Sequence, residues 1–424
     1  MNSTLILTVY LGFFVLDFLL DWFLDILNIN FVLKNRDLMP DSLEAHIDKP
    51  TYVRSVKYTL RKARFGLVQS LAGRAFVLII LFTRIFGTLD TLLTSINPGT
   101  YWQGLIFLIL ASMMFWIAAL PGSLYSQFVI EEEFGFNTTS LRTFFGDIAK
   151  QVPIALLILM ALLGGLYIIL ELAGDWWWVW AWSFWTLFQL LMAVLFPLII
   201  APLFNKFTAL PEGTLKNRLL ALADRCNFLN RGIFVMDGSR RSRHSNAYFT
   251  GIGKSRRIVL FDTLIESLQE DEIEAILAHE IGHWEFGHIC KRLAVSALGS
   301  LILFGLVGLM MDWKSFFSAF GFSSPSLHVL LFCLVFYSGP LLSFFSPVFN
   351  IWSRRHEYQA DQFAVKQTGD STSLKRALLK LGKNNLSNLR PHPAYSFWHY
   401  SHPALPERLA ELETKASSSL GRWS

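Results

Sequence analysis

Seven long apolar stretches, separated by polar segments, constrain this chain more than any other feature. They cover residues 4–28, 66–92, 103–128, 152–174, 176–204, 293–311 and 328–350. An α-helix needs roughly 20 apolar residues to cross the hydrocarbon core of a bilayer. Lipid offers no partner to backbone polar groups, so single apolar stretches cross as helices. The sequence therefore predicts an all-α polytopic membrane protein with seven transmembrane helices.

Lysine and arginine are concentrated in alternate loops. Loops 29–65 and 129–151, segment 205–292 and the tail after residue 350 carry most of them, whereas the second and fourth loops have none. Because basic loops stay on the cytoplasmic side, we expect the N-terminus outside and the C-terminus in the cytoplasm. The net charge of +5 arises from these loops, so we expect no nucleic-acid partner.

Several ionisable residues lie inside the apolar stretches. Asp17, Asp21 and Asp25 recur every four residues and would form a stripe on one face of the first helix, and Arg74, Arg84 and Glu171 occur in others. Charges at membrane depth are costly and face a protein interior or a water-filled cavity. Two interpretations remain open: an aqueous chamber between the helices, or buried ion pairs that fix helix register.

The polar segment 205–292 is large enough for a small folded unit. Gly232–Asp237, Ser245–Thr250 and Arg257–Asp262 have the composition of short strands. Gly251–Lys254 is expected to make a hairpin turn between the last two. The string GIGKS there lacks the earlier glycine of a phosphate-binding loop. We therefore expect a small β-sheet.

The motif HEIGH at residues 279–283 carries the chemistry of this segment. Two histidines four apart on a helix project from one face, so His279 and His283 can bind one Zn²⁺ at about 2.0–2.1 Å. Glu280 is not a ligand in this pattern. It lies beside the metal and can take a proton from a zinc-bound water as general base.

The surroundings of the motif favour a helix. Ser267 and Glu270 predict a capping box at its start, and Asp271 and Glu272 would follow in the first turn, where the helix dipole favours acids. Apolar residues recur beyond them at helical spacing. The motif is thus expected inside a well-started helix, outside any transmembrane span.

A catalytic zinc site needs a third protein ligand and an open position. The candidates are Glu285, His288, His356, Glu357, Asp361, His392, His399 and His402. His288 comes five residues after His283, off the face of the first two ligands. Glu357 is favoured, because it would lie on a helical extension of the seventh span with Asp361 one turn later. Asp361 could then accept the second N–H of a zinc-bound histidine.

Five segments resemble one family. HEIGHW, SRRHEYQAD, HSNAYF…RIVLFDTL, LPGSLYSQFVIEEEFGFN and YSHPALPERL are similar to segments of the type I, zinc-dependent, integral-membrane CAAX prenyl proteases. The resemblance implies zinc ligands His279, His283 and Glu357, Glu280 as general base, and Asp361 holding a ligand histidine. It also implies seven helices around an intramembrane chamber, capped by a cytoplasmic zincin-like metalloprotease domain.

The same resemblance implies three residues that act on the substrate. Asn246, on the expected edge strand, would hold the substrate backbone, since extended peptides commonly bind by adding to such an edge. His402 and Arg408 would bind substrate and donate hydrogen bonds to the oxyanion of the tetrahedral intermediate. Without the resemblance, His402 is a loop histidine and Arg408 a charge on a helix face.

These expectations divide the chain into four regions. Residues 1–204 would hold helices one to five, 205–292 the metalloprotease domain, 293–350 helices six and seven, and 351–424 a cytoplasmic C-terminal region with the third ligand and the substrate-site residues. The loops are short for a eukaryotic member of the family and the tail shows no endoplasmic-reticulum signal. A bacterial cytoplasmic membrane is therefore favoured over the endoplasmic reticulum.

Three functions compete at this point. The first is a zinc metalloendopeptidase acting on prenylated, membrane-associated or misfolded peptides near the bilayer. The second, a protease cleaving within the membrane, is disfavoured because HEIGH lies in a polar segment. The third is a transporter or channel with a structural zinc site, which would require four protein ligands.

Overall fold

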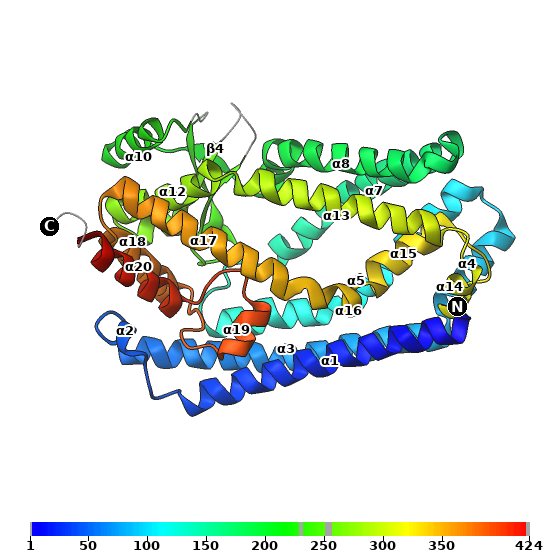
Figure 1. The fold of residues 1–424 in the computed structure, drawn as a ribbon, viewed down its shortest axis with the longest axis horizontal. Helices are drawn as coiled ribbons and strands as arrows, with labels where there is room; N and C mark the ends of the chain where they lie inside the picture. Colours follow the sequence, from blue (N-terminus) through cyan, green and yellow to red (C-terminus); the bar gives the residue numbers. More distant parts are fainter. Residues whose placement is uncertain (1, 229–231, 251–256, 421–424) are drawn as a thin grey trace.

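Long apolar helices dominate the computed structural model, which describes residues 2–228, 232–250 and 257–420. Six of the described helical segments are long and apolar enough to cross a membrane, and a bent pair of helices makes a seventh (Figure 1). This arrangement confirms the predicted polytopic membrane protein. The helices of these segments are α1 (Ser3–Lys34), α3 (Lys49–Thr83), α5 (Thr100–Tyr125), α7 (Leu141–Leu172), α8 (Trp177–Leu195), α13 (His288–Met310), and the pair α15 (Leu327–Tyr337) and α17 (Ser346–Thr368).

Shorter helices connect and cover these spans. Those between the spans are α2 (Asp41–Glu44), α4 (Ile85–Ile96) and α14 (Lys314–Ala319). Three others continue the long helical segments: α6 (Glu131–Glu133) after α5, α9 (Ala201–Phe204) after α8, and α16 (Gly339–Leu342) before α17. Those around the small sheet are α10 (Thr214–Arg225), α11 (Asp262–Ser267), α12 (Glu270–Glu285), α18 (Thr372–Asn384), α19 (Pro393–His399) and α20 (Leu405–Leu420). We call the end of the molecule that carries the sheet the sheet end.

The second predicted span, 66–92, is interrupted. α3 ends at Thr83, and Arg84 takes a left-handed conformation with a φ of 52° before α4 begins. A Cβ on Gly321 would lie only 2.9 Å from Cγ of Arg84, so this arginine packs closely on the segment after α14. Arg84 therefore lies at a helix break, and the prediction of one continuous span was wrong here.

The seventh predicted span, 328–350, is bent by 53° between α15 and the helical stretch Gly339–Thr368. Gly339 and Pro340 stand at the bend. Proline has no N–H for the helix ladder, and glycine has a low helix propensity. The bend redirects α17 toward the sheet end (Figure 1).

The sheet has four strands in the order β1 (Phe207–Ala209), β2 (Ile233–Met236), β4 (Arg257–Phe261) and β3 (Ala247–Thr250). β2 and β4 are parallel, and β1 and β3 pair antiparallel with them at the two edges. The three predicted strands are present, and β1 was missed. The predicted turn Gly251–Lys254 lies outside the described residues.

The start of α12 differs from the expectation. Its N-cap is Gln269, whose side chain accepts from the backbone N–H of Glu272, while the Glu272 carboxylate accepts from the N–H of Gln269 at 2.8 Å. Ser267 instead belongs to the last turn of α11. The capping box exists, but two residues later than predicted.

Two hydrophobic clusters stabilise the two ends of the molecule. At the end remote from the sheet, aromatic side chains from α4, α5, α14 and α15 pack together, with Phe107, Phe317 and Phe332 fully buried. At the sheet end, α12 lies at the centre of a second cluster that includes Leu219, Ile258 and Ile281. This second cluster fixes the helix that carries the HEIGH motif.

Ion pairs join some of the charged residues that lie inside the spans. Arg74 on α3 donates to Asp17 at 2.5 Å and to Asp21 at 3.0 Å, both on α1. At the far end, Asp90 accepts from Gln103 at 3.0 Å and lies 2.8 Å from Nε2 of the buried His328. The ion-pair interpretation therefore holds for Asp17, Asp21 and Arg74. Asp25, by contrast, lines a cavity.

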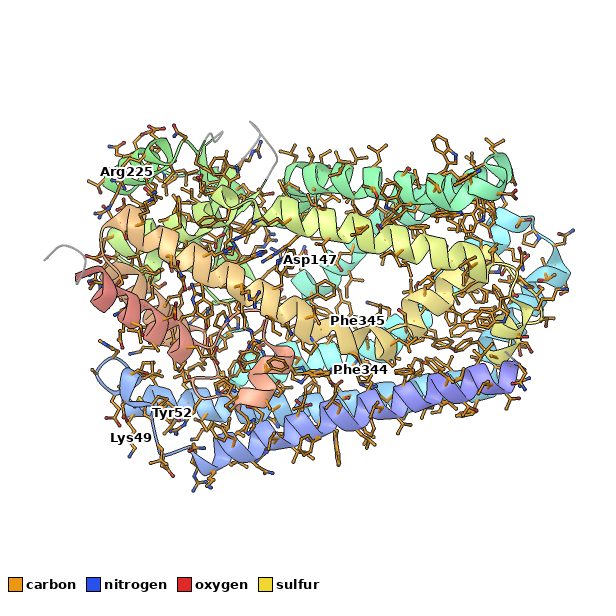
Figure 2. All side chains as sticks on the ribbon, in the orientation of Figure 1. Lys49, Tyr52, Asp147, Arg225, Phe344 and Phe345 are labelled. Carbon is orange, nitrogen blue, oxygen red and sulfur yellow. The ribbon has the colours of Figure 1, made fainter. Side chains whose placement is uncertain are left out.

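Polar and aromatic contacts tie the helices to the sheet end (Figure 2). Asp147 on α7 accepts two hydrogen bonds from Arg241, at 2.8 and 2.9 Å. The Phe344 ring lies 5.9 Å from that of Phe13 on α1 and 6.4 Å from that of Trp398 on α19. The Arg241 contact joins the sheet end to α7, and Phe344 links α1 to α19.

Candidate active site

α12 and α17 cross at close range, and Gly282 in the HEIGH motif permits it. A Cβ at this position would lie 3.0 Å from Cα of Ala360 and 3.1 Å from Cβ of Phe363. A larger residue would therefore hold the two helices apart. The crossing brings Glu357 and Asp361 of α17 against His279 and His283 of α12.

His279, His283 and Glu357 face one point. Within the described residues they form a group whose ligand atoms all lie within 4.8 Å of one another. The two Nε2 atoms are 3.2 Å apart. Glu357 places Oε2 3.5 Å from Nε2 of His279 and Oε1 3.4 Å from Nε2 of His283. The structure thus brings together the three residues predicted as ligands.

The chemistry of this group fits a divalent cation. The His279 Nδ1 lies 2.8 Å from Oδ1 of Asp361 and donates to it, which leaves the lone pair of Nε2 for a metal. Oε1 of Glu357 is buried without a hydrogen-bond partner among the described residues. Two imidazole nitrogens and a carboxylate are ligands that zinc accepts.

The charge around the centre supports the same conclusion. Burial alone would lower the pKa of His279, but its hydrogen bonds with Asp361 and Glu357 outweigh burial and raise the pKa to about 9. The carboxylates thus favour a positive charge at this point, either a proton on the histidine or a metal ion. Metal ligands must be deprotonated, so the two compete.

Glu280 lies beside this group in a cavity of about 180 Å³. Asn246, His402 and Arg408 line the same cavity, together with apolar side chains that include Leu264 and Ile276. Burial raises the pKa of Glu280 above its usual value. A carboxylate of raised pKa binds a proton more readily near neutral pH.

His402 and Arg408 approach the centre from the C-terminal region. Nδ1 of His402, in the loop before α20, is 3.0 Å from Oε2 of Glu357. Arg408 on α20 donates to both oxygens of Asp361, at 2.9 and 2.5 Å, and its Nη1 is 3.9 Å from Glu357. Arg408 therefore holds Asp361 against His279, a contact that sequence reasoning missed.

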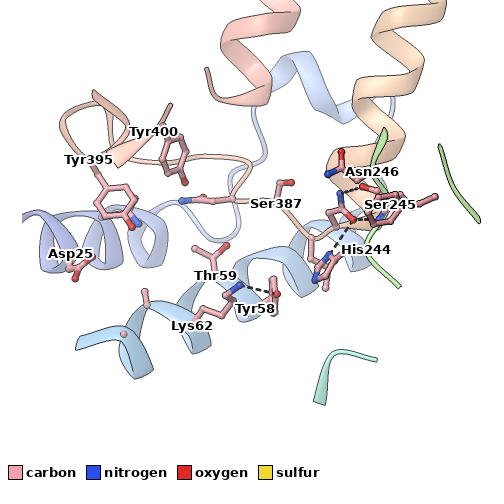
Figure 3. Close-up of a pocket in the computed structure, with 17 residues that line it drawn as sticks. Asp25, Tyr58, Thr59, Lys62, His244, Ser245, Asn246, Ser387, Tyr395 and Tyr400 are labelled. Carbon is pink, nitrogen blue, oxygen red and sulfur yellow. Dashed lines mark hydrogen bonds between the residues drawn. The ribbon is translucent and has the colours of Figure 1, made fainter. Parts of the chain in front are cut away.

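Asn246 immediately precedes the edge strand β3, so it does not lie within the strand as expected. Its backbone carbonyl accepts from the N–H of Phe261 at 3.1 Å, and its side chain accepts from the N–H of Ala247 at 2.8 Å. Asn246 also lines a second cavity of about 780 Å³, into which Asp25 and Lys62 project from the spans (Figure 3). Asn246 thus lines both the active-site cavity and this second cavity, which is also lined by residues of α1, α3 and the C-terminal region.

Asn385 is a further residue that sequence reasoning missed. Its Oδ1 accepts from the N–H of Ser245 at 3.1 Å, and its Nδ2 donates to the carbonyl of Ser245 at 3.4 Å. This side-chain amide pairs with the backbone just before Asn246 and fixes the start of β3. No spacing in the sequence connects Asn385, at the end of α18, to this strand.

The remaining candidates for a third ligand lie elsewhere. His392 caps α19, His399 lies on the same helix, and Glu285 ends α12. His288 is outside the group of possible metal ligands and lies against His283 with 2.9 Å between their Nδ1 atoms. The spacing argument placed it off the ligand face, but Gly287, with a φ of 64°, ends the helix first.

Comparisons with known proteins agree with this geometry. A family model described as CAAX prenyl protease N-terminal, five membrane helices, matches residues 28–206, and the model of peptidase family M48 matches residues 209–416. The Homo sapiens CAAX prenyl protease 1 homolog is 35% identical, over 90% of each chain. The chain belongs to the CAAX prenyl protease 1 family.

Two further relatives extend this likeness. CAAX prenyl protease 1 of Saccharomyces cerevisiae is 38% identical over 88% of each chain. The crystal structure of S. mikatae Ste24p superposes with a TM-score of 0.88 at 35% identity, covering 97% of this chain and 99% of that one. As a member of the CAAX prenyl protease 1 family, the chain is a membrane metalloendopeptidase of the zinc-dependent class, and nothing favours the transporter or channel.

Proposed function

We propose that the chain binds one Zn²⁺ through His279, His283 and Glu357. The observation that carries this proposal is the position of Glu357, which α17 brings to the two histidines with Oε1 buried and unpaired among the described residues. Asp361 accepts the Nδ1–H of His279 and so keeps its Nε2 available. Three protein ligands leave a position open, as in catalytic rather than structural zinc sites.

Glu280 acts as general base in this proposal. A bound zinc ion would polarise the scissile carbonyl and lower the pKa of water. Glu280 takes the proton from the attacking water and later delivers it to the leaving amine. Its raised pKa, a consequence of burial, supports both steps, because a base is most effective when its pKa is near the working pH.

His402, Arg408 and Asn246 act on the substrate. All three line the cavity that holds Glu280. The His402 side chain is 66% exposed, its Nδ1 contacts Glu357, and its Nε2 can donate to the oxyanion. Arg408 adds positive charge beside it. Asn246, next to the edge strand β3, holds the substrate backbone as an added strand.

We propose prenylated CAAX peptides as the substrate class, in accord with the names of the relatives. The cavity of about 780 Å³ that Asn246 also lines provides room for a membrane-anchored segment. Other membrane-associated or misfolded peptides are the second candidate. Nucleic acid plays no part, since the basic residues are explained by the loops between spans.

The topology of the protein is also part of the proposal. Residues 1–204 and 293–350 hold the spans, 205–292 form the metalloprotease domain, and 351–424 complete the site. The metalloprotease domain and C-terminus lie in the cytoplasm and the N-terminus outside, following the distribution of basic residues. A bacterial cytoplasmic membrane stays a prediction from loop lengths, and the relatives named above are eukaryotic.

A pair of variants tests the mechanism. Glu280→Gln keeps the shape of the side chain but cannot accept a proton, so we expect stoichiometric zinc with nearly all turnover lost. Glu357→Ala should lose the zinc itself. Near-normal activity in Glu280→Gln would remove this residue from the mechanism. Comparing the products from a farnesylated peptide with those from its unprenylated twin tests the substrate class: equal rates on both would favour the second candidate.

A further inference from the structure

Two side chains line up behind His283, on the side away from the metal site. Nδ1 of His283 is 2.9 Å from Nδ1 of His288, and Nε2 of His288 is 3.0 Å from Oε1 of Gln359. His288 is only 1% exposed, so water does not replace these contacts. Gln359 lies on α17, two residues after Glu357.

Gln359, at the end of the row formed by His283, His288 and Gln359, determines which nitrogen of each histidine carries a proton. The amide oxygen of Gln359 can only accept, so Nε2 of His288 carries a proton and donates it. A neutral imidazole has one N–H, so Nδ1 of His288 is an acceptor. His283 must then donate from its own Nδ1, which leaves the lone pair of its Nε2 directed at His279 and Glu357.

Aromatic packing holds the row in place. The His288 ring stacks on His356 of α17, with centroids 3.8 Å apart and planes 11° apart. Phe286 covers it at 5.7 Å. Nδ1 of His356 is buried without a hydrogen-bond partner among the described residues, so His356 contributes stacking rather than a link in the row.

We propose that His288 and Gln359 are positioning residues that hold His283 in its metal-binding tautomer. The proposal rests on the function assigned above, in which His283 is a ligand. His279 is oriented by a carboxylate, Asp361, that Arg408 neutralises. His283 is oriented by an uncharged imidazole and an uncharged amide, so the two ligands are fixed without adding a second negative charge to the centre.

Gln359 offers the sharper test, because its side-chain amide bonds to His288 rather than to one of the three proposed ligands. Gln359→Leu removes the acceptor, and Gln359→Glu keeps it. Zn²⁺ affinity is measured on the purified full chain in detergent by competition with a chromophoric chelator. Groups of this kind tune metal affinity by about 10–100-fold, so we expect a loss of that size in Gln359→Leu and in His288→Ala, with affinity restored to within a few-fold in Gln359→Glu at pH 8.

The absorption spectrum of the Co²⁺-substituted protein separates positioning from packing, because a change in packing alone should leave this spectrum unchanged. It should change in Gln359→Leu and be restored in Gln359→Glu. His356→Phe is the matched control: it keeps a stacked ring and should keep both the affinity and the spectrum. An equal loss in His356→Phe, or unchanged affinity in Gln359→Leu and His288→Ala, overturns the proposal.

His283→Ala separates this inference from the proposed function. If His283→Ala keeps tightly bound Zn²⁺, the ligand assignment itself is wrong. If His283→Ala loses the metal while His288→Ala and Gln359→Leu hold it as tightly as the parent chain, only the positioning role fails.

Discussion

At the scale of single residues, His402 is the side chain whose position says most about catalysis. It is 66% exposed, yet its Nδ1 lies 3.0 Å from the buried Glu357. Nδ1 is thus anchored at the metal site, and the side chain lines the cavity that also holds Glu280. An anchored donor of this kind suits charge that develops only in the transition state.

His402→Ala should fold and bind zinc but cleave slowly. Removing one oxyanion donor typically costs about 10²–10³ in kcat. The loss should appear in kcat and kcat/KM together, with KM little changed. Steady-state kinetics on one peptide, with zinc content measured on the same sample, check this.

Two other outcomes would assign His402 differently. A raised KM with unchanged kcat would place it in ground-state substrate binding. Zinc loss before any kinetic defect would mean that its contact with Glu357 mainly supports the ligand.

The site residues that sequence spacing could predict are those that share one helix. His279, Glu280 and His283 follow from spacing within α12. Spacing within α17 only favoured Glu357, with Asp361 one turn later, among eight candidates, and the family resemblance decided between them. The bidentate contact between Arg408 and Asp361, and that between Asn385 and Ser245, join segments far apart in the chain. Such contacts depend on how helices pack, which no local pattern contains.

At the scale of elements, the crossing of α12 and α17 determines whether the metal site forms. Gly282→Ala places a Cβ about 3.0 Å from Ala360, a backbone contact that cannot yield without moving a helix. Overpacking of this kind costs about 1–3 kcal/mol. We expect a lower thermal midpoint and weaker zinc binding, because Glu357 moves away from both histidines.

Gly299→Ala, on α13, is the control for Gly282→Ala. A Cβ there meets nothing within 4 Å, so the same chemical change should leave both properties intact. Unchanged zinc affinity in Gly282→Ala would show that the crossing tolerates expansion.

The start of α12 gives a pH-dependent prediction. Asp271 in its first turn contacts Arg376 and accepts from Ser373 of α18 at 2.8 Å. Partial burial raises the pKa of Asp271, but the Ser373 hydrogen bond and the Arg376 charge outweigh it and hold the pKa below its usual value. A depressed pKa stabilises the fold above the unfolded-state value of about 3.9, and that contribution disappears as pH falls through the folded-state value.

Asp271→Asn should therefore lower the thermal midpoint at pH 7, by an amount corresponding to about 1 kcal/mol or less. The difference from the parent chain should shrink as the pH falls below about 4. Thermal unfolding in detergent at several pH values measures it. A difference that stayed constant down to pH 3 would show that the carboxylate charge is not the cause.

Element boundaries show where sequence patterns stop being informative. Apolar length located every span, but it did not reveal the break at Arg84 or the 53° bend after Tyr337. Both interruptions depend on tertiary contacts or on a Gly-Pro pair inside an otherwise apolar run. The capping box was found two residues early because Ser267 and Gln269 both precede an acid at the correct spacing.

At the scale of the whole molecule, ion pairs hold the first two spans together. Arg74 is 18% exposed and contacts Asp17, which is 6% exposed, and Asp21. Removing one partner of a buried pair typically costs about 3–5 kcal/mol. Arg74→Leu should lower the thermal midpoint clearly, and adding Asp17→Asn should recover part of the loss.

Arg36→Leu is the control for this prediction, since Arg36 pairs with Asp37 at an exposed position and should contribute little. If Arg74→Leu instead left the midpoint unchanged and altered only peptide turnover, the charge would serve catalysis rather than the contact between the helices.

The crossing of α12 and α17 has a consequence for biogenesis. The two histidines precede α13, and the glutamate follows α15, so one complete passage through the bilayer and back lies between them. A nascent chain cannot assemble the centre until that helical hairpin has been inserted. The chain therefore has no peptidase activity until its last two spans have been inserted. A chain in which that insertion fails stays inactive even if its HEIGH helix folds.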